Sequence, residues 1–132
     1  MIWTVTFNDV SGAALVRTRG LFNTTDHRRM VADIVSRDEW HPGHPILFDH
    51  RELLFGDARY DDMLVARNSH LEYEPRIGNA RSAILMGSDA DYGLGRQFEM
   101  LASGAVSAEL KIFTDERAAR DWLSEPKRME QA

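Results

Sequence analysis

The sequence predicts one α/β domain built on a five-stranded mixed sheet. Three short apolar runs support this prediction, and each leads through a polar turn into an amphipathic segment: residues 45–49, 82–87 and 109–114. Strand and helix alternating in this way are typical of a largely parallel sheet. A chain of 132 residues has the length of one domain and can bury one substantial core. We expect residues 1–125 to form this domain and residues 126–132 to be a polar tail.

A β-hairpin is expected at the start of the chain. Residues 2–8 alternate between apolar and polar side chains, which is the period of a strand. Turn-forming residues at 9–12 separate this run from a second strand over residues 13–19, and such close spacing favours antiparallel pairing. The first helix is predicted over residues 25–36, because its apolar side chains recur at three- and four-residue spacings.

Three further strands complete the predicted sheet. Residues 46–48 and 83–86 are apolar without alternation, which indicates central strands that are covered on both faces. Residues 110–113 alternate and contain a lysine, so we expect a half-exposed strand at an edge. The order hairpin, then βαβαβα, predicts right-handed crossovers between the parallel strands.

Three more helices bring the predicted number to four. The second begins at Asp57 or one residue earlier and closes before Pro75, because the residue preceding proline disfavours helix. The third begins near Asp89, whose charge suits the positive end of the helix dipole. Thr114 is predicted to cap the last helix.

Composition excludes several classes of function. The formal net charge is −5, and the 16 basic residues are scattered among 21 acidic ones, so nucleic acid is not an expected partner. The absence of cysteine excludes disulfides, thiol nucleophiles and thiolate metal sites. No run of the sequence approaches the roughly 18–20 apolar residues needed to span a bilayer. The first residues also lack a basic segment and a cleavage site, so we expect a cytoplasmic, unprocessed protein.

A candidate ligand site is expected at the carboxyl ends of the parallel strands, where open α/β sheets bind ligands. Loops at residues 49–52, 87–91 and 114–116 should meet there. The candidate ligand-binding residues are Asp49, His50, Arg51, Ser88, Asp89 and Arg96. Asp49 and His50 are candidates for an acid/base pair. Under the alternative interpretation the acidic residues only cap helices, Arg51 neutralises Asp49, and Arg96 is a surface cation.

Metal and cofactor sites are not predicted. His41 and His44 could chelate a metal from one loop, but their spacing matches no established site, so a solvent-exposed loop is expected. No dinucleotide fingerprint or phosphate-binding loop is present, and no cofactor is expected. His27 and His70 are placed at the polar edges of their helices.

Two features predict close packing or self-association. Gly93 and Gly95 each cost about 1 kcal/mol relative to alanine within a helix, which indicates helix-on-sheet or subunit-on-subunit contact. If the crossovers place most helices on one side of the sheet, the apolar side chains on the other side need cover. We therefore expect a homodimer.

The amino-acid sequence of these elements resembles the SpoIIAA-like branch of the STAS superfamily, the anti-sigma-factor antagonist fold. The resemblance spans about residues 2–124 and rests on residues 46–49, 55–57, 82–86, 93–98, 112–115 and 118–123. It implies the same α/β fold. Signalling members bind a partner kinase or sigma-factor regulator and are switched by phosphorylation at the start of the second helix. Here Ala58 and Arg59 stand at that place, and no Ser or Thr is present to accept a phosphate.

The expected function is therefore a non-enzymatic module that binds a protein partner or a small apolar ligand. The alternative is a small acid/base enzyme that uses Asp49 and His50. An enzyme requires a pocket at the strand ends with His50 directed inward. A protein-binding module requires an exposed apolar surface around Tyr60, Met63 and Leu94.

Overall fold

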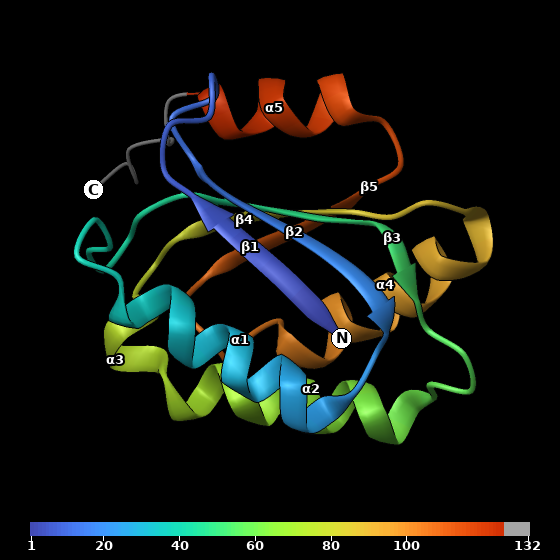
Figure 1. The fold of residues 1–132 in the computed structure, drawn as a ribbon. Helices are drawn as coiled ribbons and strands as arrows, with labels where there is room; N and C mark the ends of the chain where they lie inside the picture. The colour runs from blue at the N-terminus through green and yellow to red at the C-terminus, as the bar shows by residue number, and fades with distance from the viewer. Residues whose placement is uncertain (126–132) are drawn as a thin grey trace.

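A computed structural model describes residues 1–125 as a five-stranded sheet with helices on both faces (Figure 1). The strands lie in chain order across the sheet. Their bounds are Ile2–Thr6 (β1), Ala14–Leu21 (β2), Ile46–Leu54 (β3), Arg81–Leu85 (β4) and Glu109–Phe113 (β5). β1 pairs with β2 antiparallel and the remaining neighbours are parallel, which confirms the predicted hairpin and mixed sheet. The tail predicted for residues 126–132 lies outside the described residues.

The helices are divided between the two faces of the sheet. Their bounds are Thr24–Ser36 (α1), Tyr60–Glu72 (α2), Glu74–Ile77 (α3), Asp89–Ala102 (α4) and Glu116–Ser124 (α5). In Figure 1, α1 to α4 lie on one side of the sheet, whereas α5 alone crosses the other side. α5 contacts β3, β4 and β5. Because α5 covers these strands, the face that was expected to need a second copy of the chain is covered from within the same chain.

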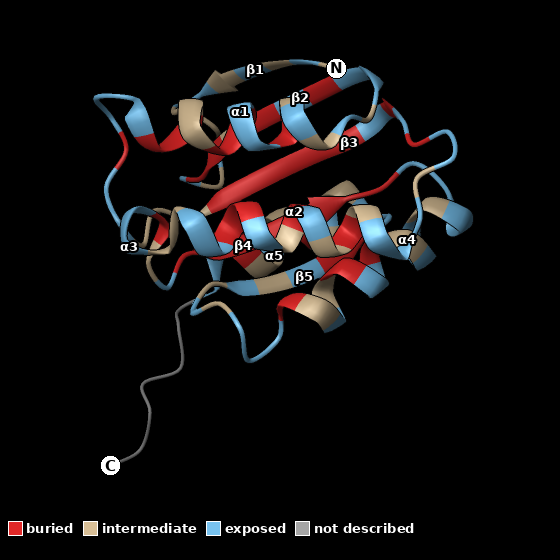
Figure 2. Ribbon diagram, turned by 90° about the horizontal axis from the view of Figure 1, so that it is seen from below, coloured by how far each residue is buried: buried red, intermediate tan, exposed pale blue. Residues whose placement is uncertain are grey.

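The central strands separate two apolar cores, as their unbroken apolar runs predict. Ile46 and Phe48 of β3 belong to the larger core under α1, α2 and α4, whereas Leu47 faces α5. On the α5 side, Leu85 of β4 joins Leu47 and packs with Leu123 of α5. Figure 2 shows the first part of β3 as buried ribbon: residues 46–50 of β3 and all of β4 are buried, whereas Arg51 and Glu52 of β3 are exposed. Among residues 1–125, α5 is the only helix whose side chains belong to the smaller core.

β3 is longer than the sequence predicts. Asp49 to Glu52 were expected to form a loop, but they lie within the strand. The extension forms because β2 runs on to Leu21 and pairs with β3 beyond the end of β4, with Leu21 opposite Leu54. The backbone N–H and C=O groups of this polar segment are therefore hydrogen-bonded to β2, although the side-chain pattern alone predicted a turn.

The helix boundaries differ at three places. α2 begins at Tyr60 rather than Asp57, because the Asp62 carboxylate accepts a hydrogen bond from the Arg59 backbone N–H at 2.8 Å and fixes the start there. Pro75 lies in the first turn of the short α3, where the N–H that proline lacks would have no helical partner. α3 is a fifth helix, which the sequence pattern did not predict. Asp115, not Thr114, caps α5.

The two glycines of α4 have different roles, and this gives a stability prediction. A Cβ on Gly95 would lie 2.9 Å from Met86 Cε and 3.1 Å from Ile112 Cγ2, so helix and sheet are in close contact there. A Cβ on Gly93 would meet no described atom within 4 Å. We expect Gly93→Ala to raise the free energy of unfolding by about 0.5–1 kcal/mol and Gly95→Ala to give no such gain. Urea denaturation of both variants checks this, and an equal gain in both would contradict the close contact.

Candidate functional site

An internal cavity of about 40 Å³ lies between the sheet and helices α1, α2 and α4. Its lining is apolar apart from three histidines; the lining residues are Phe22, His27, Phe48, His50, Phe55, Met63, Ala66, His70, Ile84, Met86, Gly95 and Phe98. Of these, Phe22 is partly exposed and the others are buried. The Phe22 ring packs 5.5 Å from that of Phe55 and 6.0 Å from that of His27, measured between ring centroids. We refer to this space as the three-histidine cavity.

The three histidines come from three different elements. His27 lies on α1, His50 on β3 and His70 on α2, with 7%, 7% and 4% of each residue exposed. The ring centroids of His27 and His70 are 5.7 Å apart, and the Phe98 ring lies 5.3 Å from that of His70. His50 packs against Phe48 and Phe55 on the sheet side. Residues distant in the sequence thus bring three imidazoles to one apolar cavity.

Hydrogen bonding distinguishes His50 from the other two. The His50 Nδ1 lies 2.6 Å from the Thr18 Oγ1, which is also 3.3 Å from the Asp49 carbonyl oxygen. By contrast, Nδ1 of His27 and Nδ1 of His70 are buried without a hydrogen-bond partner in residues 1–125. A buried polar atom left in this state costs about 1–3 kcal/mol. Folded proteins rarely retain such atoms, and two of the five in residues 1–125 belong to histidines that line the cavity.

Burial keeps the three imidazoles neutral. Desolvation lowers the pKa of His50 to about 4, although the nearby Asp49 charge opposes the shift. Desolvation likewise lowers the pKa of His70 to about 4 against a small opposing effect of Glu74. The pKa of His27 falls well below its ordinary value, because of burial and then because of repulsion by His70 and His50. At neutral pH the cavity therefore contains no charge.

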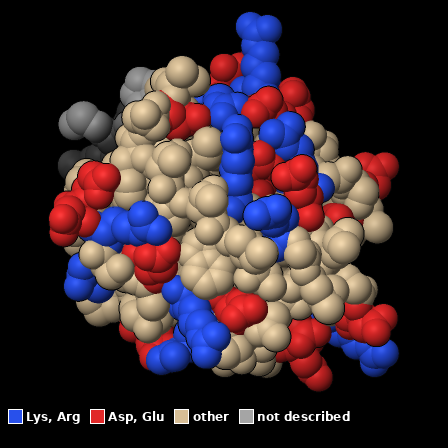
Figure 3. Space-filling view, in the orientation of Figure 1, with Lys and Arg blue, Asp and Glu red and all other residues tan. Residues whose placement is uncertain are grey.

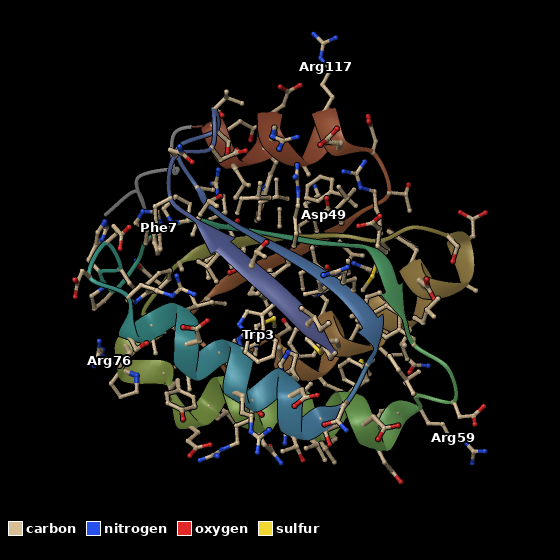
Figure 4. The ribbon with its side chains drawn as sticks, in the orientation of Figure 1. Trp3, Phe7, Asp49, Arg59, Arg76 and Arg117 are labelled. Atoms are coloured by element: carbon tan, nitrogen blue, oxygen red, sulfur yellow. The ribbon has the colours of Figure 1, made fainter. Side chains whose placement is uncertain are left out.

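Asp49 lies on the other face of the sheet, toward α5 (Figure 4). Its carboxylate accepts two hydrogen bonds from the Arg51 guanidinium, at 3.0 and 2.8 Å, and lies 3.8 Å from Arg17. Arg51 also reaches Glu116 of α5 at 3.2 Å. Partial burial raises the pKa of Asp49, but the hydrogen bonds and charge of Arg51, with Arg17, lower it overall. Asp49 and His50 thus project from opposite faces of β3, and Arg51 neutralises Asp49 as the alternative interpretation predicts.

The remaining candidate residues lie on the exposed side of α4. Ser88 caps this helix by accepting a hydrogen bond from the Asp91 N–H at 3.1 Å. Asp89 is exposed in the first turn. Arg96 is exposed and pairs with Glu99 one turn along the helix. Among the six residues proposed from the sequence, only His50 lines the three-histidine cavity.

His27 and His70 were wrongly placed at the polar edges of their helices. Both are on the buried face, and their spacing contains the signal. His27 precedes Met30 and Ile34 by three and seven residues, and His70 follows Met63 and Ala66 by seven and four. Residues at these intervals share one face of a helix. Because histidine was counted as a polar residue, the apolar stripe of each helix was predicted without His27 or His70.

The loop histidines have local partners instead. The rings of His41 and His44 are 4.8 Å apart. The His44 Nδ1 lies 2.9 Å from the Pro45 carbonyl oxygen, and its ring packs on Trp40 and Phe7. Within residues 1–125, no three His, Cys, Asp or Glu side chains are grouped so that they could hold a metal ion.

Comparison with known proteins identifies the fold. The chain matches no protein-family model and no curated protein sequence. It is similar to the crystal structure of an uncharacterized DUF3478-family protein with a SpoIIAA-like fold from Shewanella loihica PV-4. The TM-score is 0.58, the sequence identity is 20%, and the match covers 92% of each chain. None of the helices in the described range has the length and apolar character required to cross a bilayer. The chain therefore has the SpoIIAA-like α/β fold that its resemblance to the STAS superfamily implies.

Proposed function

We propose that this SpoIIAA-like chain is a cytosolic, non-enzymatic module that binds a small, largely apolar ligand in the three-histidine cavity. The observation that carries the proposal is the pair of unpartnered Nδ1 atoms on His27 and His70, two residues that line the cavity. A bound ligand with one hydrogen-bonding group would satisfy at least one of these nitrogens. In the empty protein these unsatisfied nitrogens lower the free energy of unfolding, and ligand binding explains why the chain retains them.

A protein-docking role has less support. It requires an exposed apolar surface around Tyr60, Met63 and Leu94, but Met63 is buried at the cavity and Leu94 is only partly exposed. Tyr60 is 53% exposed. Tyr60 and Leu94 line an open surface groove, but Arg59, Asp91 and Gln97 line it as well, so it is not the mainly apolar surface that docking would require.

The acid/base enzyme is a second candidate, because His50 does face a pocket. Its orienting partner would be Thr18 at 2.6 Å and not Asp49. Any candidate reaction should then be lost in His50→Ala and should be unchanged in Asp49→Asn. Ligand binding without turnover in wild-type protein favours the binding module over the enzyme.

Native mass spectrometry of protein purified from its source tests the binding function. We expect a mass excess over the denatured chain that is lost on denaturation. The excess should be absent from His70→Phe, which fills the cavity, and present in the exposed-loop variant His41→Phe. A wild-type chain that has no excess mass and takes up no added small molecule would contradict the proposal.

We also propose that the chain is a homodimer, and the β1 edge is the surface that favours it. Within the described part of the chain, β1 has a neighbour on one side only and carries no charged residue, whereas β5 at the other edge has Glu109 and Lys111. Charged side chains on edge strands discourage pairing. Thr4 lies opposite Arg17 of β2, so Thr4→Glu is compatible with the monomer but places like charges across an antiparallel β1–β1 contact.

Light scattering after size exclusion tests this assembly. We expect a dimer mass for wild-type protein, a monomer mass for Thr4→Glu and for Thr4→Lys, and a restored dimer when the two variants are mixed. Figure 3, which has the orientation of Figure 1, shows an uncharged area beside a row of Lys or Arg and Asp or Glu side chains on the side of the molecule where β1 lies. A monomeric wild-type mass at micromolar concentration would contradict the proposal.

A further inference from the structure

We infer that the three-histidine cavity selects an uncharged molecule of a few heavy atoms that joins a hydroxyl or similar hydrogen-bonding group to an apolar group. The inference rests on the proposed binding function and specifies its ligand. It follows from the charge, the polarity and the size of the cavity, which are independent of one another.

The lining excludes ions. Among its twelve residues there is no Asp, Glu, Lys or Arg. The guanidiniums of Arg51, which follows His50, and of Arg17, which precedes Thr18, are turned toward Asp49 on the other face of the sheet. An anion or cation that enters would lose its water without gaining a counter-charge, which is strongly unfavourable.

The polarity of the lining calls for one hydrogen-bonding group. The rings of His27 and His70 lie 5.7 Å apart at one wall, and each has an unpartnered Nδ1. A neutral imidazole has one donor and one acceptor nitrogen, and which nitrogen carries the proton depends on its partners. A hydroxyl both donates and accepts, so it matches either tautomer. The remaining wall, including Phe48, Ile84 and Phe98, accepts only apolar surface.

The size of the cavity limits the ligand. About 40 Å³ has room for roughly three water-sized groups. Met63 and Met86 line the space, and their unbranched side chains can shift to widen it slightly. Phe22, the partly exposed lining residue, lies in the chain between β2 and α1. A ligand of the size of a three-carbon alcohol would fill the slightly widened space.

A set of four probes with equal numbers of heavy atoms tests the inference at neutral pH: propan-2-ol, isobutane, acetate and isopropylammonium. Long-range ¹H–¹⁵N NMR spectra report the ring nitrogens of His27 and His70, and methyl spectra report Met63. We expect propan-2-ol to shift these signals saturably. The other three probes should bind at least about tenfold more weakly, because each lacks either the hydrogen bond or the neutral charge.

Variants locate the effect within the cavity. His27→Phe and His70→Phe each remove one hydrogen-bonding ring and should weaken propan-2-ol binding by about tenfold or more. His41→Phe replaces an exposed histidine outside the cavity and should leave binding unchanged. Amide spectra of each variant establish that it is folded, and the comparison of probes on wild-type protein does not depend on any variant.

Each contrary outcome is distinct. Equal or tighter binding of acetate or isopropylammonium overturns the neutral-ligand inference but leaves the binding function intact. Equal binding of isobutane shows that the histidines do not contribute and also overturns the inference. If Zn²⁺ displaces propan-2-ol by coordinating His27 and His70, the cavity is a metal site and the inference is overturned. If no probe shifts any cavity signal, the inference fails, and the proposed function fails with it when the wild-type chain also has no mass excess.

Discussion

Lowering the pH from about 7 to about 5 is expected to reduce the free energy of unfolding by about 2 kcal/mol for each of His50 and His70. Both have a pKa of about 4 in the folded protein, against 6.5 for an ordinary histidine. His27 is shifted in the same direction and adds to the loss. The total is a large part of the 5–15 kcal/mol that stabilises a typical domain.

The direction of this effect follows from which state binds protons. Above pH 6.5 these histidines are neutral in both the folded and the unfolded chain, so they carry no penalty. As the pH falls below 6.5, the histidines of the unfolded chain bind protons, whereas the buried histidines of the folded chain remain neutral. Stability therefore decreases between pH 6.5 and about 4, where the folded histidines begin to bind protons as well.

Urea denaturation at several pH values between 7 and 5 measures this loss. His70→Phe is the matched variant, because it removes one of the buried titrating groups and should reduce the slope of stability against pH by up to about 1.4 kcal/mol per pH unit. His41→Phe, at an exposed position, serves as the control for replacing a histidine outside the cavity. A stability that is flat over this range would show that the three rings are not buried in neutral form.

Replacing His70 by phenylalanine is expected to stabilise the protein by about 1–3 kcal/mol at neutral pH, while ligand binding is lost. The substitution removes a buried nitrogen that has no partner in the described residues, and the larger ring occupies part of the cavity. Phe98 and Met63 offer apolar contacts to the new ring. A variant that is more stable but no longer binds the ligand would indicate that the histidine is retained for binding and not for stability.

Thr18→Val provides the contrasting variant. Here the substitution removes the partner of a nitrogen, so His50 Nδ1 joins the Nδ1 atoms of His27 and His70 as a third unsatisfied histidine nitrogen at the cavity. We expect a loss of about 1–3 kcal/mol, of opposite sign to the effect of His70→Phe. Thermal or urea unfolding of both variants gives the comparison. A large destabilisation by His70→Phe would mean that His70 has a structural partner and is not reserved for a ligand.

Local sequence pattern was sufficient to predict most of the fold. Alternation in β1 and the apolar stripe of α1 reflect one buried face, and the unbroken apolar runs in β3 and β4 reflect two, so each pattern is visible in neighbouring residues. The extension of β3 depends instead on pairing with β2, and the start of α3 depends on where Pro75 falls after α2 ends. Both are decided by tertiary or backbone contacts that side-chain periodicity does not report.

The site was predicted only in part, for a different reason. His50 was found because it follows a buried strand, but its neighbour Asp49 was assigned to the same side of the sheet. Since the strand continues through both residues, alternation sends them to opposite faces. His27 and His70 occupy core positions of their helices at the spacing of apolar residues. The cavity itself arises from how Phe22, Met63 and Phe98 pack, and periodicity cannot distinguish a filled core from a hollow one.

The most direct test of the central claim is an NMR titration of the ring nitrogens of His27, His50 and His70. The claim is that these three imidazoles form one uncharged cavity site. All three should be neutral at pH 6, and His50 and His70 should titrate only near pH 4. His50 should in addition show a tautomer fixed by its hydrogen bond to Thr18. If any of the three rings is protonated at pH 6, the cavity is not the dry, neutral site that the proposed ligand requires.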